Sequence, residues 1–172
     1  KSDISLSAGN TGALLVLSKI ILKMIEGIDK PALAGLWPNK NGMNIVLDLG
    51  ANVDCNEKNL IDFSNMGSAL YLSLFPEDVA KDSILNIGSE EIKGHEIIKE
   101  AYQRLKSRIH KGFEFNGYIE GNNIMNGDSN VIVTDGFTGN IALKTAEGTA
   151  NFITKSLKES LSSNLINKFG AF

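Results

Sequence analysis

Several polar turns in this sequence carry residue types that could bind an anion and stabilise a developing negative charge. The clearest turn, Asp135-Gly-Phe-Thr-Gly-Asn140, follows the β-branched run 131–134 and precedes an apolar-periodic stretch that contains Lys144. A strand that turns directly into a helix exposes unpaired backbone N–H groups at the positive end of the helix dipole. The pattern predicts an anion site, with phosphate as the first candidate, built from Asp135, Gly136, Thr138 and Asn140 and supplemented by the charge of Lys144.

A second turn of this kind lies near the beginning of the sequence. It reads Ser7-Ala-Gly-Asn-Thr-Gly12, after the alternating residues 4–7 and before the apolar stretch 13–22. The pattern predicts a strand, a turn and a helix, with anion contacts from Ser7, Gly9, Asn10 and Thr11. A simpler explanation is that the glycines permit tight turns and that Thr11 or Thr138 caps a helix. Neither turn matches a Walker loop or a complete dinucleotide fingerprint, so spacing alone does not identify the ligand.

Polar residues also follow or accompany the other predicted strands. Asp48, Asn52 and Asp54 come at the end of the run 43–50. Asn86 belongs to the predicted strand 82–88, and Lys93 lies at its exit. Asn116 and Glu120 belong to the predicted strand 113–121. Open α/β sheets bind ligands beyond the carboxyl ends of their strands. The carboxylates of Asp48 and Asp54 could hold a cation or orient a polar ligand, or they could cap the next helix and satisfy loop amides. No metal-ligand spacing is present, and we expect no metal.

These turns require an alternating α/β framework to position them. Helices are predicted over 13–22, with an end near Gly27, and over 59–74, 95–108 and about 138–162. The last of these helices carries an apolar stripe, which predicts that this face of the helix is buried. The extended run 31–37, the turn 38–42 and the strand 43–50 predict an antiparallel hairpin. The sequence therefore predicts a single α/β domain over 1–172, with a hairpin inserted among otherwise alternating strands and helices.

Composition limits the possible partners. The chain has 172 residues with 17 basic and 20 acidic side chains, which does not favour nucleic acid as a ligand. Cys55 is the only cysteine, so an intrachain disulfide is excluded and a reducing compartment is favoured. No apolar run reaches membrane-spanning length. The predicted helix 95–108 ends in a basic surface, which is either a solvated face or a docking site for an acidic partner, at Lys99, Arg104, Lys106, Arg108 and Lys111.

Taken together, the motifs resemble those of one family in type and in order. They are Ser7-Ala-Gly-Asn-Thr-Gly12, Asp48-Leu-Gly-Ala-Asn-Val-Asp-Cys55, Leu85-Asn-Ile-Gly88, Lys93-Gly94, Gly117-Tyr-Ile-Glu-Gly121, Asp135-Gly-Phe-Thr-Gly-Asn140 and Leu143-Lys-Thr-Ala-Glu-Gly148. The chain resembles bacterial phosphate acyltransferase, the PlsX family of phospholipid synthesis. The resemblance runs from about Ser7 into the final helix.

The resemblance implies transfer of a long-chain fatty acyl group from acyl carrier protein to inorganic phosphate, without a cofactor. It also implies a homodimer with a three-layer α/β sandwich and a mostly parallel sheet, related to the isopropylmalate dehydrogenase and phosphotransacetylase fold group. A cytoplasmic protein with peripheral contact to the inner face of the membrane, and to the next acyltransferase of phospholipid synthesis, is expected.

With phosphate as the nucleophile, catalysis would depend on positioning and charge stabilisation. The candidate catalytic residues are Asn52, Asn86, Lys93, Asn116, Asn140 and Lys144. Phosphate contacts are expected from the two glycine-containing turns, with Asp48, Glu120 and Asp135 as orienting carboxylates. Lys99, Arg104 and Arg108 are the candidate docking residues for the acidic carrier protein.

The chain departs from the family pattern in two places. Family members begin upstream with an Asp-Ala-Met-Gly-Gly-Asp motif that is absent here, so we expect this chain to be the central to C-terminal part of a longer protein. Around Glu120 the family reads Gly-Asn-Ile-Glu-Gly-Arg-Asp, whereas this chain has Tyr118 and Asn122-Asn123. The alternatives are a short-chain phosphotransacetylase, a nicotinamide-dependent decarboxylating dehydrogenase, or a non-catalytic scaffold that binds the carrier protein.

Overall fold

A five-stranded, mostly parallel sheet forms the centre of the computed structural model, which describes residues 5–107, 109–110 and 112–162. Its strand order is β1-β2-β5-β3-β4. Strands β1 (Ala34–Asn39) and β2 (Gly42–Leu47) form the predicted antiparallel hairpin. Strands β2, β5 (Val131–Val133), β3 (Lys81–Asn86) and β4 (Glu114–Glu120) pair in parallel. Their carboxyl ends therefore meet at one edge of the sheet, where the polar loops begin.

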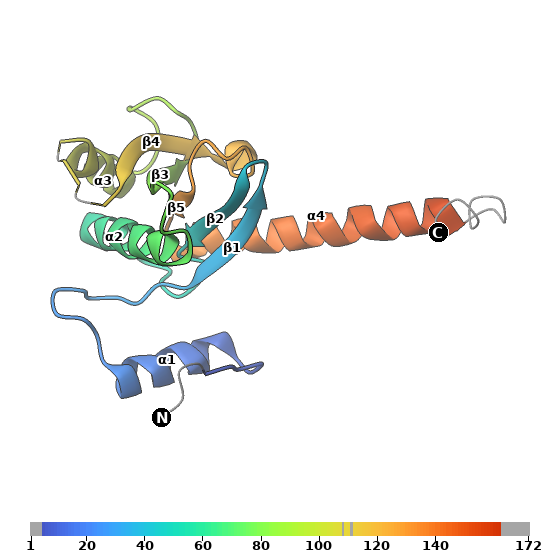
Figure 1. The fold of residues 1–172 in the computed structure, drawn as a ribbon, viewed down its shortest axis with the longest axis horizontal. Coiled ribbons are helices and arrows are strands. Elements are labelled where there is room, and N and C mark those ends of the chain that lie inside the picture. The colour runs from blue at the N-terminus through green and yellow to red at the C-terminus, as the bar shows by residue number, and fades with distance from the viewer. Residues whose placement is uncertain (1–4, 108, 111, 163–172) are drawn as a thin grey trace.

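Helices cover both faces of this sheet, which gives three layers (Figure 1). Helices α2 (Glu57–Leu74) and α3 (Glu96–Lys106) enclose one hydrophobic cluster with alternate strand residues such as Ile84 and Val133. The first turns of α4 (Gly136–Ser162) enclose the other with residues such as Leu85 and Ile132. The inner strands are buried on both faces, yet only β5 is apolar throughout, and β3 also buries Asp82, Ser83 and Asn86. A short 3₁₀ helix, η1 (Gly121–Asn123), follows β4.

Helix α1 (Thr11–Leu22) lies apart from these layers and contains no buried residue (Figure 1). The strand predicted before it is wrong for the residues that can be described, because Ser5 to Asn10 form no strand and are all exposed; Ile4 lies outside the described residues. A strand needs a neighbour to pair its backbone groups, and no described strand pairs with this segment.

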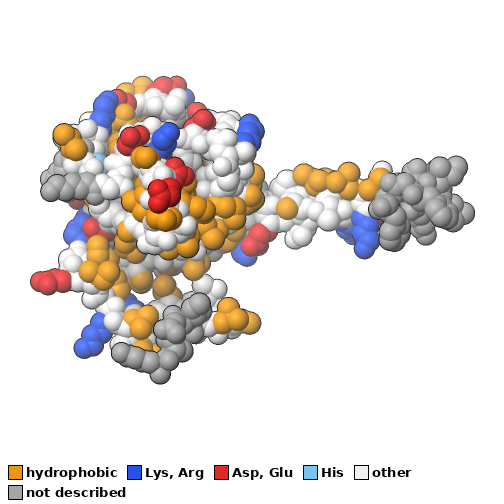
Figure 2. All heavy atoms as spheres, in the orientation of Figure 1, with side chains coloured by type: hydrophobic (Ala, Val, Ile, Leu, Met, Phe, Trp, Pro, Cys, Tyr) orange, Lys and Arg blue, Asp and Glu red, His pale blue; other side chains and the backbone are white. Residues whose placement is uncertain are grey.

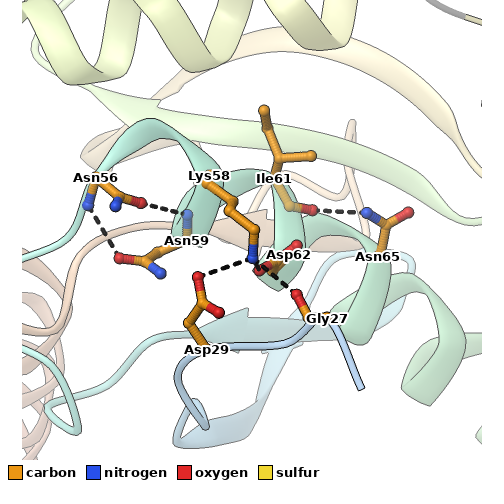
Figure 3. A network of polar contacts seen from close by, with 8 residues as sticks. All are labelled: Gly27, Asp29, Asn56, Lys58, Asn59, Ile61, Asp62 and Asn65. Atoms are coloured by element: carbon orange, nitrogen blue, oxygen red, sulfur yellow. Dashed lines mark hydrogen bonds and ion pairs between the residues drawn. The ribbon is translucent and has the colours of Figure 1, made fainter. Parts of the chain in front are cut away.

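The segment between α1 and β1 is attached to the start of α2 by one lysine (Figure 3). The Lys58 ammonium lies 2.9 Å from a carboxylate oxygen of both Asp29 and Asp62, and 2.8 Å from the Gly27 carbonyl oxygen. Its hydrogen bonds to Asp29 and then Asp62 raise the pKa of Lys58. Two further contacts hold the same segment, from the Lys30 ammonium to the Asp54 carbonyl and from the Asn52 amide to the Pro31 carbonyl, both at 2.6 Å.

The apolar stripe predicted to be buried along the last helix is exposed where the structure describes it, from Ile141 to Leu161, and α4 packs on the sheet through Ala142, Leu143 and Ala146 instead. Phe152, Ile153, Leu157 and Leu161 are all at least half exposed, and Figure 2 shows hydrophobic side chains along the projecting part of α4. The reason is length: 27 residues span about 40 Å, so the helix continues beyond the short strands that it covers. Among the described helices, none is long and apolar enough to cross a membrane.

Candidate functional site

The loop after β2 is built around the buried carboxylate of Asp48. One of its oxygens accepts hydrogen bonds from the backbone N–H groups of Leu33, Gly50 and Ala51, at 3.0, 3.2 and 2.9 Å. The other accepts from the backbone and side-chain nitrogens of Asn52, at 2.8 and 2.7 Å. Asp48 thus fixes the shape of residues 48–52, and this corresponds to the expectation that it satisfies loop amides. Its contact with a substrate remains a prediction.

We expect Asp48→Asn to destabilise the protein by about 2 kcal/mol, because an amide N–H₂ group would face two N–H donors where a carboxylate oxygen now accepts. Urea unfolding of the complete gene product measures this change. Asp54→Asn, in the same loop but exposed, is the matched control. Equal unfolding midpoints for the two variants would contradict the role of Asp48.

The start of α4 is occupied by groups of the chain itself. The Thr138 backbone N–H and hydroxyl both donate to the Asp135 carboxylate at 2.8 Å, and the Gly136 N–H donates to the Asn52 carbonyl at 2.8 Å. In this arrangement a carboxylate sits where the sequence pattern predicts an external anion. Asp135, and not Thr138, therefore caps this helix.

At the start of α1 the cap is also not a threonine. The Asn10 side chain accepts the Ala13 N–H at 3.0 Å, and the Ser7 hydroxyl accepts the Gly9 N–H at 3.2 Å. Neither helix has an acidic residue in its first turn, but the residue before α1 is the neutral Asn10, whereas the Asp135 carboxylate precedes α4. The first two residues of α1, Thr11 and Gly12, line a cavity that is described below.

Three of the four asparagines that are catalytic candidates have both side-chain amide hydrogens engaged within the protein. The Asn52 amide donates to the Pro31 carbonyl at 2.6 Å and to the Asp48 carboxylate. The Asn86 side-chain amide donates to the Gly88 and Lys93 carbonyls of its own loop. The Asn116 amide bonds to the loop before β5, at the opposite edge of the sheet from the polar loops. The structure thus separates Asn116 from the other candidates.

Asn140 differs from these three because its amide lies at a cavity wall, beside Gly50, without a hydrogen bond to any described residue. The cavity measures about 420 Å³ and lies between α1, the segment before β1, the loop after β2, and α4. We call it the α1 cavity. Its polar and glycine lining consists of Thr11, Gly12, Ser18, Gly50, Asn140 and Lys144; its apolar lining consists of Leu14, Leu15, Pro31, Ala32, Leu33, Leu49, Ala51 and Leu143.

The α1 cavity brings together candidates from three separate motifs, because Thr11, Asn140 and Lys144 all line it. The Lys144 ammonium also pairs with Glu147 at 2.8 Å on the exposed side of α4. Sequence reasoning missed Gly12, Gly50 and the apolar walls. The two glycines belong to the quoted motifs, whereas the leucines of α1 were predicted only as part of an apolar helix.

A second polar group lies at the ends of β3 and β4. The Lys93 ammonium is 2.9 Å from a Glu90 carboxylate oxygen, and its pKa is raised chiefly by Glu90, with a smaller contribution from Glu120. Asn86 is buried beside it, against Gly94, and its side-chain oxygen has no partner among the described residues. Lys93, Asn86 and Glu120 are thus neighbours, but they do not line the α1 cavity.

The basic surface of α3 is largely paired with acidic side chains. Lys99 lies 2.8 Å from Glu96, and Arg104 lies 3.1 Å from Glu57. Lys106 also forms an ion pair. Arg108 and Lys111 lie outside the described residues. Surface pairs of this kind are weak, so a strongly charged partner could still replace them.

The remaining titratable residues near the edge form no metal site. Within the described ranges, no group of three or more His, Cys, Asp and Glu side chains is placed to hold a metal ion. Cys55 lines a different cavity of about 430 Å³, together with His95 and Asp135. Burial raises the pKa of the Cys55 thiol, which opposes its use as a nucleophile.

Known proteins resemble this chain in sequence and in fold. The family described as "Fatty acid synthesis protein" matches residues 1–172. The chain is 68% identical to the "Phosphate acyltransferase" of Pelagibacter ubique, in a match that covers 99% of this chain and 51% of the relative. It is 49% identical to the "Phosphate acyltransferase" of Paramagnetospirillum magneticum, in a match that covers 95% of this chain and 46% of that relative. It therefore spans about half the length of these curated relatives.

Among solved structures, EutD phosphotransacetylase from Staphylococcus aureus superposes with a TM-score of 0.57 at 17% identity. The match covers 78% of this chain and 46% of that one. At this identity the likeness shows the fold alone, and it confirms the predicted phosphotransacetylase fold group. The family match over the whole chain decides the family: the chain belongs to the fatty acid synthesis proteins, the PlsX family of phosphate acyltransferases.

Proposed function

We propose that the complete gene product transfers a long-chain fatty acyl group from acyl carrier protein to inorganic phosphate. The product would be an acyl phosphate for phospholipid synthesis. The observation that carries this proposal is the α1 cavity, where Thr11, Asn140 and Lys144 lie beside apolar walls. A phosphate and an alkyl chain need these two kinds of surface next to each other.

In the proposed reaction phosphate is the nucleophile. One of its oxygens forms a bond to the thioester carbonyl carbon, the carbonyl oxygen becomes an oxyanion, and the carbon–sulfur bond then breaks. The thiolate leaves with the electron pair and takes up a proton. No acyl-enzyme is needed, so the protein contributes by positioning the reactants and stabilising charge.

The geometry supports specific roles for three residues. Thr11 lies at the start of α1, where the backbone N–H groups and the helix dipole favour an anion, so we place phosphate there. Lys144 adds a positive charge from the opposite wall. The Asn140 amide, which is not used by another described residue, is the donor that we assign to the oxyanion. Lys144 is also the lysine that we assign to protonating the departing thiolate, because Lys93 does not line the cavity.

The wider setting of the reaction is proposed from the family. In this proposal the acidic acyl carrier protein docks on Lys99, Arg104 and Arg108 and displaces the weak surface pairs of Lys99 and Arg104. The exposed apolar side chains of the projecting part of α4 support contact with a second copy of the chain or with the inner face of the cytoplasmic membrane. Contact with the next acyltransferase of phospholipid synthesis completes the proposal.

Asn140→Ala and Lys144→Ala test the reaction and the site together. We expect each to lower phosphate-dependent release of free carrier protein from a long-chain acyl carrier protein by about a hundredfold, the effect of losing one transition-state donor. The assay uses the complete gene product. Asn65→Ala and Lys155→Ala, on exposed surfaces of α2 and α4, are the matched controls and should retain parental rates.

Different outcomes separate the alternatives. Absence of phosphate-dependent turnover in the folded parent would exclude the acyltransferase and favour a scaffold that only binds the carrier protein. Turnover of acetyl coenzyme A in preference to long-chain substrates would identify a short-chain phosphotransacetylase. Full activity in both site variants would place the reaction elsewhere on the molecule.

A further inference from the structure

The lining of the α1 cavity changes from polar to aliphatic along the length of the cavity. Thr11 and Ser18 are seven residues apart on α1, so the helix side of the cavity extends for about 10 Å. Leu14 and Leu15 lie between them, and Ser18 follows on the same face of the helix, since residues three and four apart are neighbours. The cavity therefore continues from the proposed phosphate end into an aliphatic channel.

The wall opposite α1 is fixed by the sheet. The Leu49 N–H donates to the Leu33 carbonyl at 2.9 Å, and the Leu33 N–H donates to the Asp48 carboxylate at 3.0 Å. Leu49 is buried, and Leu33 and Leu143 pack against the hydrophobic cluster beneath α4. These contacts make a rigid apolar floor, in contrast to α1, which has no buried residue.

Two other cavities lie near α4 and suit an alkyl chain less well. The one at the α4 start contains Asp54, His95 and Asp135, which would have to lose water around an aliphatic ligand. The other, beside Trp37, has an apolar lining, but its α4 wall runs from Ala142 to Ile153 and excludes Asn140. The α1 cavity alone, of these three, joins an apolar channel to Asn140 and Lys144.

We propose that the α1 cavity holds the hydrocarbon chain of the acyl group, between the leucines of α1 and the floor made by Leu33, Leu49 and Leu143. The carbonyl end lies at Asn140, and the methyl end points along α1 toward Ser18. Ser18 is thus a specificity-determining position that limits chain length. This inference rests on the proposed acyl transfer to phosphate, and it adds the place and direction of the acyl chain.

The test introduces a large side chain at the far end of the channel. Ser18→Trp should lower the ratio of kcat/KM for a sixteen-carbon acyl carrier protein to kcat/KM for an eight-carbon one at least tenfold, because the longer chain loses its apolar contacts. Lys19→Trp places the same side chain on the next residue of α1, which does not line the cavity, and should leave the parental ratio unchanged. The complete gene product is used in each assay.

A binding experiment separates this inference from the reaction itself. A fluorescent sixteen-carbon fatty acid should bind to the parent and to Lys19→Trp, and at least tenfold more weakly to Ser18→Trp, whether or not turnover occurs. Weakened binding without turnover in the parent would reject the proposed reaction and keep the chain site. An unchanged chain-length ratio and unchanged probe binding in Ser18→Trp would overturn the chain site while leaving phosphate-dependent turnover as evidence for the reaction.

Discussion

Replacing Asp82 by valine should stabilise the protein at pH 8 by about 4 kcal/mol and remove a pH dependence of its stability. Asp82 lies on β3 among the residues that face α2 and α3, and it is fully buried. Neither of its carboxylate oxygens has a hydrogen-bond partner in the part of the chain that the structure describes. An ionised carboxylate in such a position is strongly disfavoured.

The pH dependence follows from this burial. Desolvation raises the pKa of Asp82 to about 7, although the Ser64 hydroxyl and the Ser83 backbone lie near enough to offset part of the shift. Between about pH 4 and pH 7 the folded protein keeps the Asp82 proton, whereas the unfolded chain has released it. Stability therefore falls as pH rises through this window, by about 4 kcal/mol for a shift of roughly three units, and is low above it.

Urea unfolding at several pH values between 4 and 8 measures the effect as the difference between variant and parent. Asp82→Asn should flatten the same dependence with a smaller gain, because a buried amide without partners keeps a desolvation cost. Asp128→Asn, an exposed carboxyl on the loop before β5, is the control and should follow the parent. Parallel curves for Asp82→Val and the parent would show that Asp82 does not titrate in this window.

Substituting Gly139 by alanine should destabilise the protein by more than about 3 kcal/mol and reduce turnover. A Cβ atom at this position would lie 1.9 Å from the Asp48 carbonyl oxygen and 2.9 Å from a Thr134 methyl carbon. The first of these neighbours is backbone in a loop that hydrogen bonds hold in place, so it cannot move aside cheaply. Helix α4 would have to shift, and Asn140 would shift with it.

Gly148 in the same helix is the matched control, because a Cβ atom there would meet no heavy atom within 4 Å. Gly148→Ala should stabilise the protein by up to about 1 kcal/mol, as expected for an exposed glycine in a helix. Thermal or urea unfolding of the two variants therefore gives changes of opposite sign. Equal changes would mean that α4 does not pack on the β2 exit through Gly139.

Local pattern determined the framework and the family of this protein. The β-branched run 131–133, the hairpin around residues 40–41 and the helical periodicities were sufficient to predict alternating strands and helices with an inserted hairpin, and the family resemblance added the mostly parallel sheet. The motif order was sufficient to predict the family that the whole chain matches. Both succeed because strand and helix periods, and glycine-containing turns, are properties of neighbouring residues.

Tertiary contacts decided which of the candidate asparagines has a side-chain amide without a hydrogen bond to another described residue. Asn52, Asn86 and Asn140 all follow strands in the sequence, yet partners such as the Pro31 carbonyl engage the first two and leave the third at a cavity. The sequence also did not show that residues 5–10 form no strand or that the described end of α4 is exposed, because pairing and burial depend on neighbours distant along the chain. A sequence shows which groups can form hydrogen bonds, whereas only the folded chain shows which of them are already satisfied.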